Sequence, residues 1–216
     1  MVVYAYNPRV TSLLSVPSNH TVLLTGAFAS WQYVTPVADR LRRALSFHPA
    51  LGRFAARFLE DRVPSSWNAT SFVRVGVHVR RGDFLQRRRV AKGFTTAPVG
   101  YLRRALGYFV GRFGRVQFVV ASNDIRWCRA YIRPSELDPD RVSVTFSEGH
   151  TAGEDLALLA SCNHTIITTG TYGWWAAWFV NGITVYYSNF PRHGSSLANR
   201  SRKTEYYPPN WIGIGD

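Results

Sequence analysis

Hydrophobic and polar positions alternate along this chain with two periods, and the period changes from segment to segment. In residues 72–79 valines occupy every second position, opposite Arg74, Gly76 and His78, which predicts a strand. Apolar runs predict further buried strands at residues 22–25, 116–121, 142–146, 165–168 and 184–187. Apolar residues three or four positions apart predict helices at residues 34–47, 51–59, 98–110, 124–133, 154–161 and 171–180.

Strands that alternate with helices at this spacing indicate a mostly parallel sheet covered by helices on both faces. The predicted fold class is therefore α/β, with a doubly wound sheet. In such sheets ligands bind just beyond the carboxyl ends of the strands. Polar residues that directly follow a predicted strand are consequently the first candidates for chemistry.

Composition and charge narrow the classes of partner. The 216 residues are 46% hydrophobic and 14% aromatic, which suits a packed core and excludes a disordered chain. Lys and Arg number 26 against 13 Asp and Glu, a net charge of +13, and only Lys92 and Lys203 are lysines. Arginine suits phosphate and carboxylate, so we expect an anionic partner. Nucleic acid is disfavoured, because no aromatic residues suited to base stacking accompany a continuous basic stripe.

The two cysteines, Cys128 and Cys162, are too few for a disulfide scaffold or a zinc site built from cysteines, and whether they pair is open. No apolar run reaches the length of a membrane span, and the first residues lack the pattern of a signal peptide. Four glycosylation sequons, against the one or two expected by chance, favour the lumen of the secretory pathway. They begin at Asn19, Asn68, Asn163 and Asn199.

The segment after the 72–79 strand contains two consecutive arginines. It reads His78-Val79-Arg80-Arg81-Gly82-Asp83, and Gly82 lets the backbone turn sharply. Two guanidinium groups at the open edge of a sheet can grip a diphosphate. A solvated arginine pair that forms a salt bridge with Asp83 is the alternative.

Two other strand ends carry short polar side chains. Thr168-Thr169-Gly170-Thr171-Tyr172 joins a strand to a helix, which favours a phosphate cradle, with an ordinary capped turn as the alternative. Ser122 and Asn123 end another strand, and Asp124 is predicted to cap the following helix. Asp155 is predicted as an acid in the first turn of its helix, with hydrogen bonding to a base or ribose as the alternative.

Several other patterns predict no chemistry. Asp138-Pro139-Asp140 is predicted as a turn, and Arg87-Arg88-Arg89 as a solvated loop that could attract an anion. The sequence contains no Walker loop, no Gly-x-Ser-x-Gly elbow, no His-Glu-x-x-His motif and no Rossmann glycine fingerprint.

Taken together, ordered segments from about residue 22 to the end carry a family resemblance. They are residues 75–83 (VGVHVRRGD), 118–123 (FVVASN) with Trp127-Cys128, 155–177, 184–186 and 209–214 (PNWIGI). In this order and spacing they resemble the α-1,2-fucosyltransferases of glycosyltransferase family 11, the histo-blood-group H-type enzymes.

The resemblance implies transfer of L-fucose from GDP-β-L-fucose to the 2-hydroxyl of a terminal galactose on a glycan, with inversion and without a metal or other cofactor. It implies a two-domain GT-B fold in which residues 71–216 form the Rossmann-like GDP-fucose-binding domain. Residues 1–70 would then be a remnant of the amino-terminal acceptor side with linking helices. The partners of the protein would be the nucleotide sugar and a galactoside-terminated glycan, and not nucleic acid.

Members of the family face the Golgi lumen and have a membrane anchor and a Gly-Arg-Leu-Gly-Asn-Gln motif, which do not occur in this sequence. We therefore expect an amino-terminally truncated member that would meet a membrane only through an anchor outside this chain. The alternative is a catalytically impaired fragment that binds GDP-fucose or a partner without transfer.

The resemblance also suggests roles for individual residues. Arg80 would absorb the negative charge of the departing GDP, with Arg81 assisting or structural. Asp155 and the backbone near His78 would recognise guanine. Asp83 would orient donor or acceptor and is one candidate for the catalytic base, with His78 as the other. The remaining residues expected to bind the donor are Ser122, Asn123, Thr169, Gly170, Thr171 and Tyr172.

Overall fold

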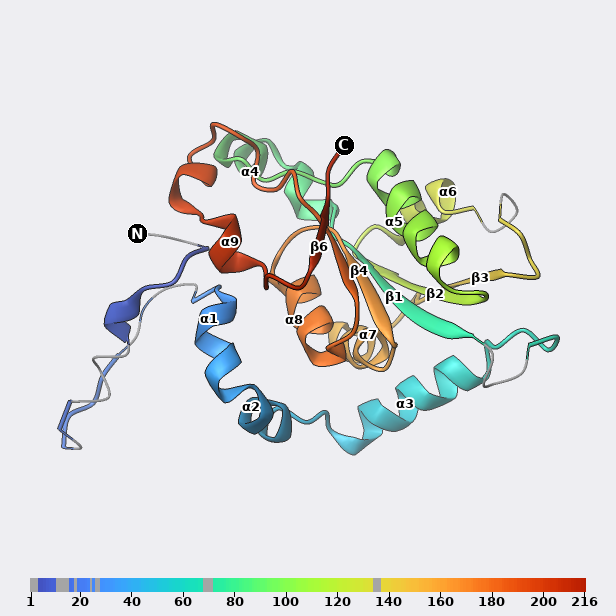
Figure 1. Cartoon of the computed structure of the whole chain (residues 1–216), viewed down its shortest axis with the longest axis horizontal. Helices are drawn as coiled ribbons and strands as arrows, with labels where there is room; N and C mark the ends of the chain where they lie inside the picture. The colour runs from blue at the N-terminus through green and yellow to red at the C-terminus, as the bar shows by residue number, and fades with distance from the viewer. Residues whose placement is uncertain are drawn as a thin grey trace.

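A computed structural model of the chain describes residues 4–10, 16–17, 19–23, 25, 28–67, 72–133 and 137–216. Within these residues, six parallel strands form one sheet in the order β3-β2-β1-β4-β5-β6 (Figure 1). The strands are β1 (Val73–Val79), β2 (Val116–Ser122), β3 (Val142–Phe146), β4 (His164–Ile167), β5 (Thr184–Tyr187) and β6 (Ile212–Ile214).

Helices cover both faces of the sheet, as the doubly wound prediction requires. They include α5 (Val99–Arg112) and α6 (Ile125–Tyr131) on one side and α7 (Ala152–Ala160) and α8 (Thr171–Val180) on the other (Figure 1). The alternation of side chains along β1 shows how each face of the sheet is covered. Val75, Val77 and Val79 are fully buried in the main core, whereas Gly76 faces Leu159 of α7 so closely that a Cβ would lie 3.1 Å from its side chain.

The amino-terminal helices run along the α7–α8 side (Figure 1). They are α1 (Trp31–Val34), α2 (Ala38–Ala44) and α3 (Pro49–Glu60), with the 3-10 turn η2 (Thr35–Val37) between the first two. Phe58 and Leu59 of α3 are buried against Val119 and Leu158, so this helix is held to the sheet domain by an apolar contact.

Shorter elements complete the edge of the sheet that holds the candidate site. They are the 3-10 turns η3 (Gly82–Leu85) and η5 (Ala198–Arg200) and the helices α4 (Arg87–Lys92) and α9 (Lys203–Tyr206). The predicted loop at Arg87-Arg88-Arg89 is therefore wrong, because these residues form α4, which ends at Gly93 in the left-handed conformation with φ +106°. The sequence patterns did not predict β6 either.

Most other predicted elements are confirmed, and two further exceptions lie in the amino-terminal part. The predicted strand at residues 22–25 is wrong: Val22, Leu23 and Thr25 form no strand, Leu23 is 83% exposed, and residue 24 lies outside the described residues. Apolar residues alone do not make a strand without a neighbour to pair with. The predicted helix at 34–47 is broken at the 3-10 turn η2, because Pro36 in this turn cannot donate a helical hydrogen bond.

Local capping explains where the helices next to the site begin. Asp124 caps α6, as predicted, with its carboxylate accepting from the backbone N–H of Trp127 at 3.3 Å. Helix α7 begins with a capping box between Thr151 and Glu154 and has Asp155 in its first turn. The predicted positions of Asp124 as a helix cap and of Asp155 as an acid in a first helical turn are therefore confirmed.

The predicted turn at residues 138–140 is also confirmed, with the Asp140 N–H bonded to Asp138 Oδ1 at 3.0 Å. Cys128 and Cys162, both within the described residues, are buried and form no disulfide. Across the described ranges, no helix has the length and apolar character that crossing a membrane requires.

Candidate functional site

The strand order reverses between β1 and β4, so the segments that follow these two strands diverge at one edge of the sheet. Ligands of open α/β sheets bind at such a switch point. Two hollows open here among the described residues. The β1–β4 hollow, of about 240 Å³, is lined by Tyr4, His78, Arg80, Asp83, Phe84, Arg89, Phe94, Thr169, Gly170, Thr171 and Tyr172. The β1–β2 hollow, of about 260 Å³, is lined by His78, Arg80, Ala121, Ser122, Asn123, His150, Ala152, Asp155 and Tyr172.

Three side chains, those of His78, Arg80 and Tyr172, line both hollows and form the wall between them. The Tyr172 hydroxyl donates to the carbonyl of Ala152 at 2.6 Å, which ties the start of α8 to the start of α7. Its ring lies 4.9 Å from the His78 ring. The wall is therefore braced by contacts within the protein and needs no ligand to form.

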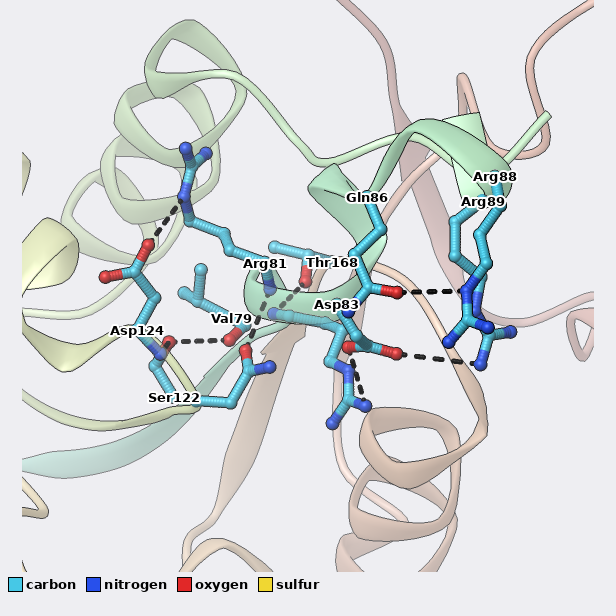
Figure 2. Close-up of polar contacts among 11 residues, drawn as sticks. Val79, Arg81, Asp83, Gln86, Arg88, Arg89, Ser122, Asp124 and Thr168 are labelled. Atoms are coloured by element: carbon cyan, nitrogen blue, oxygen red, sulfur yellow. Dashed lines mark hydrogen bonds and ion pairs between the residues drawn. The ribbon is translucent and has the colours of Figure 1, made fainter. Parts of the chain in front are cut away.

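Arg80 leaves β1 at the switch point itself. Its backbone N–H donates to Thr168 Oγ1 at 2.8 Å, which links the ends of β1 and β4 (Figure 2). Its guanidinium lies 2.8 Å from Asp83, carried on the η3 turn, and 35% of the side chain is exposed. Arg80 is thus held in place and still open to a ligand from either hollow.

Arg81 is held in a different way. Its side chain points toward Asp124 and away from Asp83 (Figure 2), with Nε 3.3 Å from the Asp124 carboxylate. The guanidinium stacks over the Trp127 ring at 3.9 Å, and only 15% of the side chain is exposed. The two arginines that were expected to grip one diphosphate therefore have different partners, and this geometry fits the structural role considered for Arg81.

The sequence predicts Arg89 in a solvated loop, but in the structure this residue lines the β1–β4 hollow. Its guanidinium lies 3.8 Å from the Asp83 carboxylate on the side opposite Arg80. The neighbouring Arg88 instead bonds to Gln86 on the surface (Figure 2). The run of three arginines was the only signal in the sequence, and it could not tell which of the three turns inward.

The threonine turn after β4 closes the β1–β4 hollow. Thr168 accepts the Arg80 N–H, whereas the Thr169 hydroxyl is buried and has no hydrogen-bond partner in the described part of the chain. Gly170 precedes α8 with φ +88°, a conformation that favours glycine, and no side chain caps the helix. The first N–H groups of this ten-residue helix are therefore available for an anion.

His78 is buried beneath this turn and is uncharged at neutral pH. Burial, and secondarily the nearby Arg80 charge, lowers the pKa of His78 to about 3. Its Nδ1 finds no hydrogen-bond partner among the residues described. Gly173 of α8 allows the close approach, because a Cβ there would lie 2.5 Å from Nδ1.

An acid dominates the polar lining of the β1–β2 hollow. Asp155 accepts from the Ser147 hydroxyl at 2.5 Å, and the same Ser147 oxygen lies 2.8 Å from His150 Nδ1. Burial raises the pKa of Asp155, against the lowering effect of the Ser147 hydrogen bond. A carboxylate in this position can accept hydrogen bonds from N–H groups of a ligand.

Ser122 and Asn123, also expected to bind a donor, line this hollow but already have partners in the protein. The Ser122 hydroxyl donates to the carbonyl of Val79 at 2.7 Å, and Asn123 Oδ1 accepts from the Arg81 N–H at 2.9 Å. Both side chains therefore join the end of β2 to the end of β1. For the Asn123 amide nitrogen, no hydrogen bond is found within the described part of the chain, so this donor is the one we consider for a ligand.

The described residues contain no group of three or more His, Cys, Asp or Glu side chains arranged to hold a metal ion. Of the sequon asparagines, Asn19, Asn163 and Asn199 are exposed, and Asn68 lies outside the described residues. Asn163 also accepts the Arg74 N–H at 2.8 Å, and the Thr165 of its sequon is buried and bonded to Thr184.

Solved structures with a similar fold include POFUT1 in complex with GDP-fucose, which covers 83% of this chain and 59% of its own, at 14% identity and a TM-score of 0.52. POFUT1 in complex with GDP covers 83% and 58%, at 13% identity and a TM-score of 0.50. At these identities the likeness shows the fold alone. It confirms the predicted fold class, a Rossmann-like unit of a GT-B-type glycosyltransferase.

Curated relatives are closer in sequence. "Galactoside 2-alpha-L-fucosyltransferase Sec1" of Mus musculus is 37% identical over 90% of this chain and 52% of its own length. "Galactoside alpha-(1,2)-fucosyltransferase 1" of Homo sapiens is 35% identical over 88% of this chain and 52% of its own length. The chain thus spans about half the length of these relatives. The sequence profile described as "Glycosyl transferase family 11" matches residues 5–215, and the chain therefore belongs to glycosyl transferase family 11.

Proposed function

We propose that this chain transfers L-fucose from GDP-β-L-fucose to the 2-hydroxyl of a terminal galactose on a glycan, with inversion at the fucose carbon. Family membership and the names of the relatives support the reaction. The observation that carries the proposal is the position of Arg80: it stands at the switch point, faces both hollows and lies beside the uncapped start of α8.

The chemical demand on such a site is electrostatic. As the bond between fucose and GDP breaks, positive charge grows on the sugar and negative charge on the departing diphosphate. Arg80 and the free N–H groups of α8 line the β1–β4 hollow and can stabilise that charge without rearranging. The Thr169 hydroxyl, which is buried and has no partner among the described residues, could add a donor only if its side chain turned toward the hollow. Thr171, exposed at the start of α8, supplies a second hydroxyl.

The β1–β2 hollow would hold the guanine base. Asp155 can accept hydrogen bonds from the N–H groups of guanine, and the backbone next to His78 lies on the same wall. The Ser147 hydrogen bond fixes the carboxylate in place before a ligand arrives. The Asn123 amide nitrogen and Tyr172 complete the wall toward the diphosphate.

Inverting transfer needs a group that takes the proton of the 2-hydroxyl as its oxygen bonds to the fucose carbon and the bond to GDP breaks. Of the two candidates, His78 is buried and has a pKa of about 3, which makes it a weak base. Asp83 is more exposed, and its contact with Arg80 supports the orienting role as well. We therefore assign the acid–base role to Asp83 in preference to His78.

We also propose a domain organisation and a cellular location for the chain. Residues 71–216 would bind GDP-fucose, and residues 1–70 would belong to the acceptor side and its linking helices, with a galactoside-terminated glycan as acceptor. Because the family is Golgi-resident, we place the site in the Golgi lumen, which also suits glycosylation at the exposed Asn19 and Asn199. No metal or other cofactor is assigned a role.

The test is to incubate the purified chain with GDP-fucose and a terminal galactoside and to measure fucosylated product, free fucose and GDP. Fucose on the 2-hydroxyl supports the proposal. The fact that the chain spans about half of its relatives favours one second candidate, a chain that binds GDP-fucose without transferring it. GDP binding without transfer or hydrolysis would select that candidate, and no GDP binding at all would contradict both.

A further inference from the structure

A second cation faces the β1–β4 hollow, and it is not the neighbour of Arg80 in the sequence. Of the described residues that line this hollow, Arg80 and Arg89 are the two that carry a positive charge. We infer that Arg89 is a second positioning residue for the diphosphate of the nucleotide sugar. This inference rests on the proposed function and deepens it, because it names which two guanidinium groups the anion meets.

Asp83 holds the two arginines together. One carboxylate oxygen lies 2.8 Å from Arg80 Nη2, and the other lies 3.8 Å from Arg89 Nη2 (Figure 2). A guanidinium has five N–H donors in a planar fork, so each arginine keeps donors for a ligand after it has contacted Asp83. The side chains of Arg80 and Arg89 are 35% and 41% exposed, which leaves these donors accessible.

An aromatic floor orients the same two groups. The Arg80 guanidinium lies over the Phe84 ring at 5.5 Å, and the Arg89 guanidinium lies over the Phe94 ring at 4.9 Å. The two rings meet edge to face with centroids 4.8 Å apart. Stacking of this kind restricts a guanidinium without consuming its hydrogen-bond donors, so both arginines are preorganised for an anion.

The chain reversal at Gly93 explains why Phe94 can serve Arg89. Gly93 ends α4 with φ +106°, and the Phe94 N–H donates back to the carbonyl of Arg89 at 3.1 Å. A Cβ at Gly93 would lie 2.0 Å from the Ser195 hydroxyl, so the turn is also packed from outside. The position of Arg89 is consequently a product of the local fold and differs from that of Arg88 on the same helix.

Charge balance supports the assignment. With two guanidinium groups and one carboxylate, this part of the hollow has one excess positive charge, whereas Arg80 and Asp83 without Arg89 would be neutral. A diphosphate carries more than one negative charge, and a neutral pair would attract it weakly. Arg81 cannot supply the missing charge while Asp124 and Trp127 hold its side chain.

The experiment compares Arg89→Gln with Arg88→Gln by calorimetric titration of the full chain with GDP and, at higher concentration, with guanosine. Arg88 is the matched control, because it lies on the same helix and bonds to Gln86. We expect Arg89→Gln to weaken GDP binding about 10-fold, the loss of one charge-assisted contact. Guanosine binding should stay unchanged, and Arg88→Gln should leave both affinities at the wild-type value.

A variant that keeps the charge separates binding from folding. Arg89→Lys should recover part of the lost GDP affinity, and it keeps a cation beside Asp83 if Arg89→Gln unfolds. Equal GDP affinities for Arg89→Gln and Arg88→Gln, or equal losses for GDP and guanosine in Arg89→Gln, would overturn the inference. If those results came with a wild-type chain that binds GDP and an Arg80→Gln variant that does not, the proposed function would survive. A wild-type chain that fails to bind GDP would overturn the proposed function, and this inference with it.

Discussion

The β1–β4 and β1–β2 hollows share a wall of His78, Arg80 and Tyr172, but the polar groups beyond that wall have opposite character. The β1–β4 hollow adds a second arginine, the open start of α8 and the buried Thr169, whose hydroxyl has no hydrogen-bond partner among the residues described. The β1–β2 hollow adds the Asp155 carboxylate fixed by Ser147. One side is thus suited to an anion and the other to a ligand with N–H donors.

If the chain binds GDP as we propose, this difference assigns the two ends of the nucleotide to different sides of one sheet edge. The anion side is built from backbone N–H groups and arginines, which remain charged at any physiological pH. The donor-accepting side depends on one half-buried carboxylate, that of Asp155, whose charge depends on pH. Substitutions on each side should therefore affect different parts of the ligand.

The largest effect is expected from Arg80→Gln, because Arg80 lines both hollows. GDP affinity should fall by about 100-fold or more, and inorganic pyrophosphate should no longer bind measurably. Calorimetric titration checks this, with thermal unfolding as the test that the variant is folded. Retention of GDP affinity within a few-fold of wild type would break the account of the anion side.

Asp155→Asn tests the β1–β2 hollow in the way that Arg80→Gln tests the anion side. We expect GDP affinity to fall about 10-fold, because the amide has no charge and replaces one acceptor oxygen with an NH2 donor, while pyrophosphate affinity stays unchanged. Burial raises the pKa of Asp155, so in the wild type the same loss should set in at a higher pH than for an exposed aspartate as the pH falls. Equal losses for GDP and pyrophosphate would contradict this assignment.

His78 in the shared wall should affect stability more than chemistry. Its pKa is about 3 in the folded chain and near 6.5 when unfolded, so the unfolded chain binds more protons between these values. Stability from this group is full above pH 6.5 and is lost as the pH falls. Between pH 6.5 and 5, wild type should lose about 2 kcal/mol more unfolding free energy than His78→Gln, measured with urea. Parallel pH profiles for the two chains would refute this.

Arg81→Gln should show the smallest change and serves as the counterpart of Arg80→Gln. Loss of its contacts with Asp124 and Trp127 should lower the unfolding free energy by about 1 kcal/mol. GDP affinity should remain at the wild-type value, because this side chain points toward Asp124 and away from Asp83 (Figure 2) and does not line the β1–β4 hollow. A large loss of GDP affinity with unchanged stability would return Arg81 to the binding site.

Sequence patterns predicted β1 to β5 well, because these strands are buried or half-buried and read as short apolar runs, with an alternation of valines in β1. The valine alternation of β1 and the polar residues after β1, β2 and β4 were sufficient to locate the functional edge. The roles of individual arginines were not predictable. The position of Arg81 depends on a tertiary contact with Asp124, 43 residues further on. The position of Arg89 depends on the local chain reversal at Gly93, which the run of three arginines does not indicate.

The amino-terminal part shows the opposite case. The apolar residues Val22 and Leu23 match a strand pattern, but both are exposed. Within the described residues β5 pairs with β6, so that edge of β5 is not open to another strand. Local pattern predicts a strand only when a partner is available to satisfy its backbone. The predicted helix at residues 34–47 is broken for a different reason. Pro36 has no backbone N–H to donate, and this single residue outweighs the apolar periodicity around it.

The most direct measurement is a crystal structure of this chain with GDP. We expect electron density for the diphosphate in the β1–β4 hollow, within hydrogen-bond distance of Arg80 and the first N–H groups of α8, and for the base beside Asp155. Density for GDP elsewhere on the chain, or a diphosphate in this hollow without contact to Arg80, would contradict this expectation.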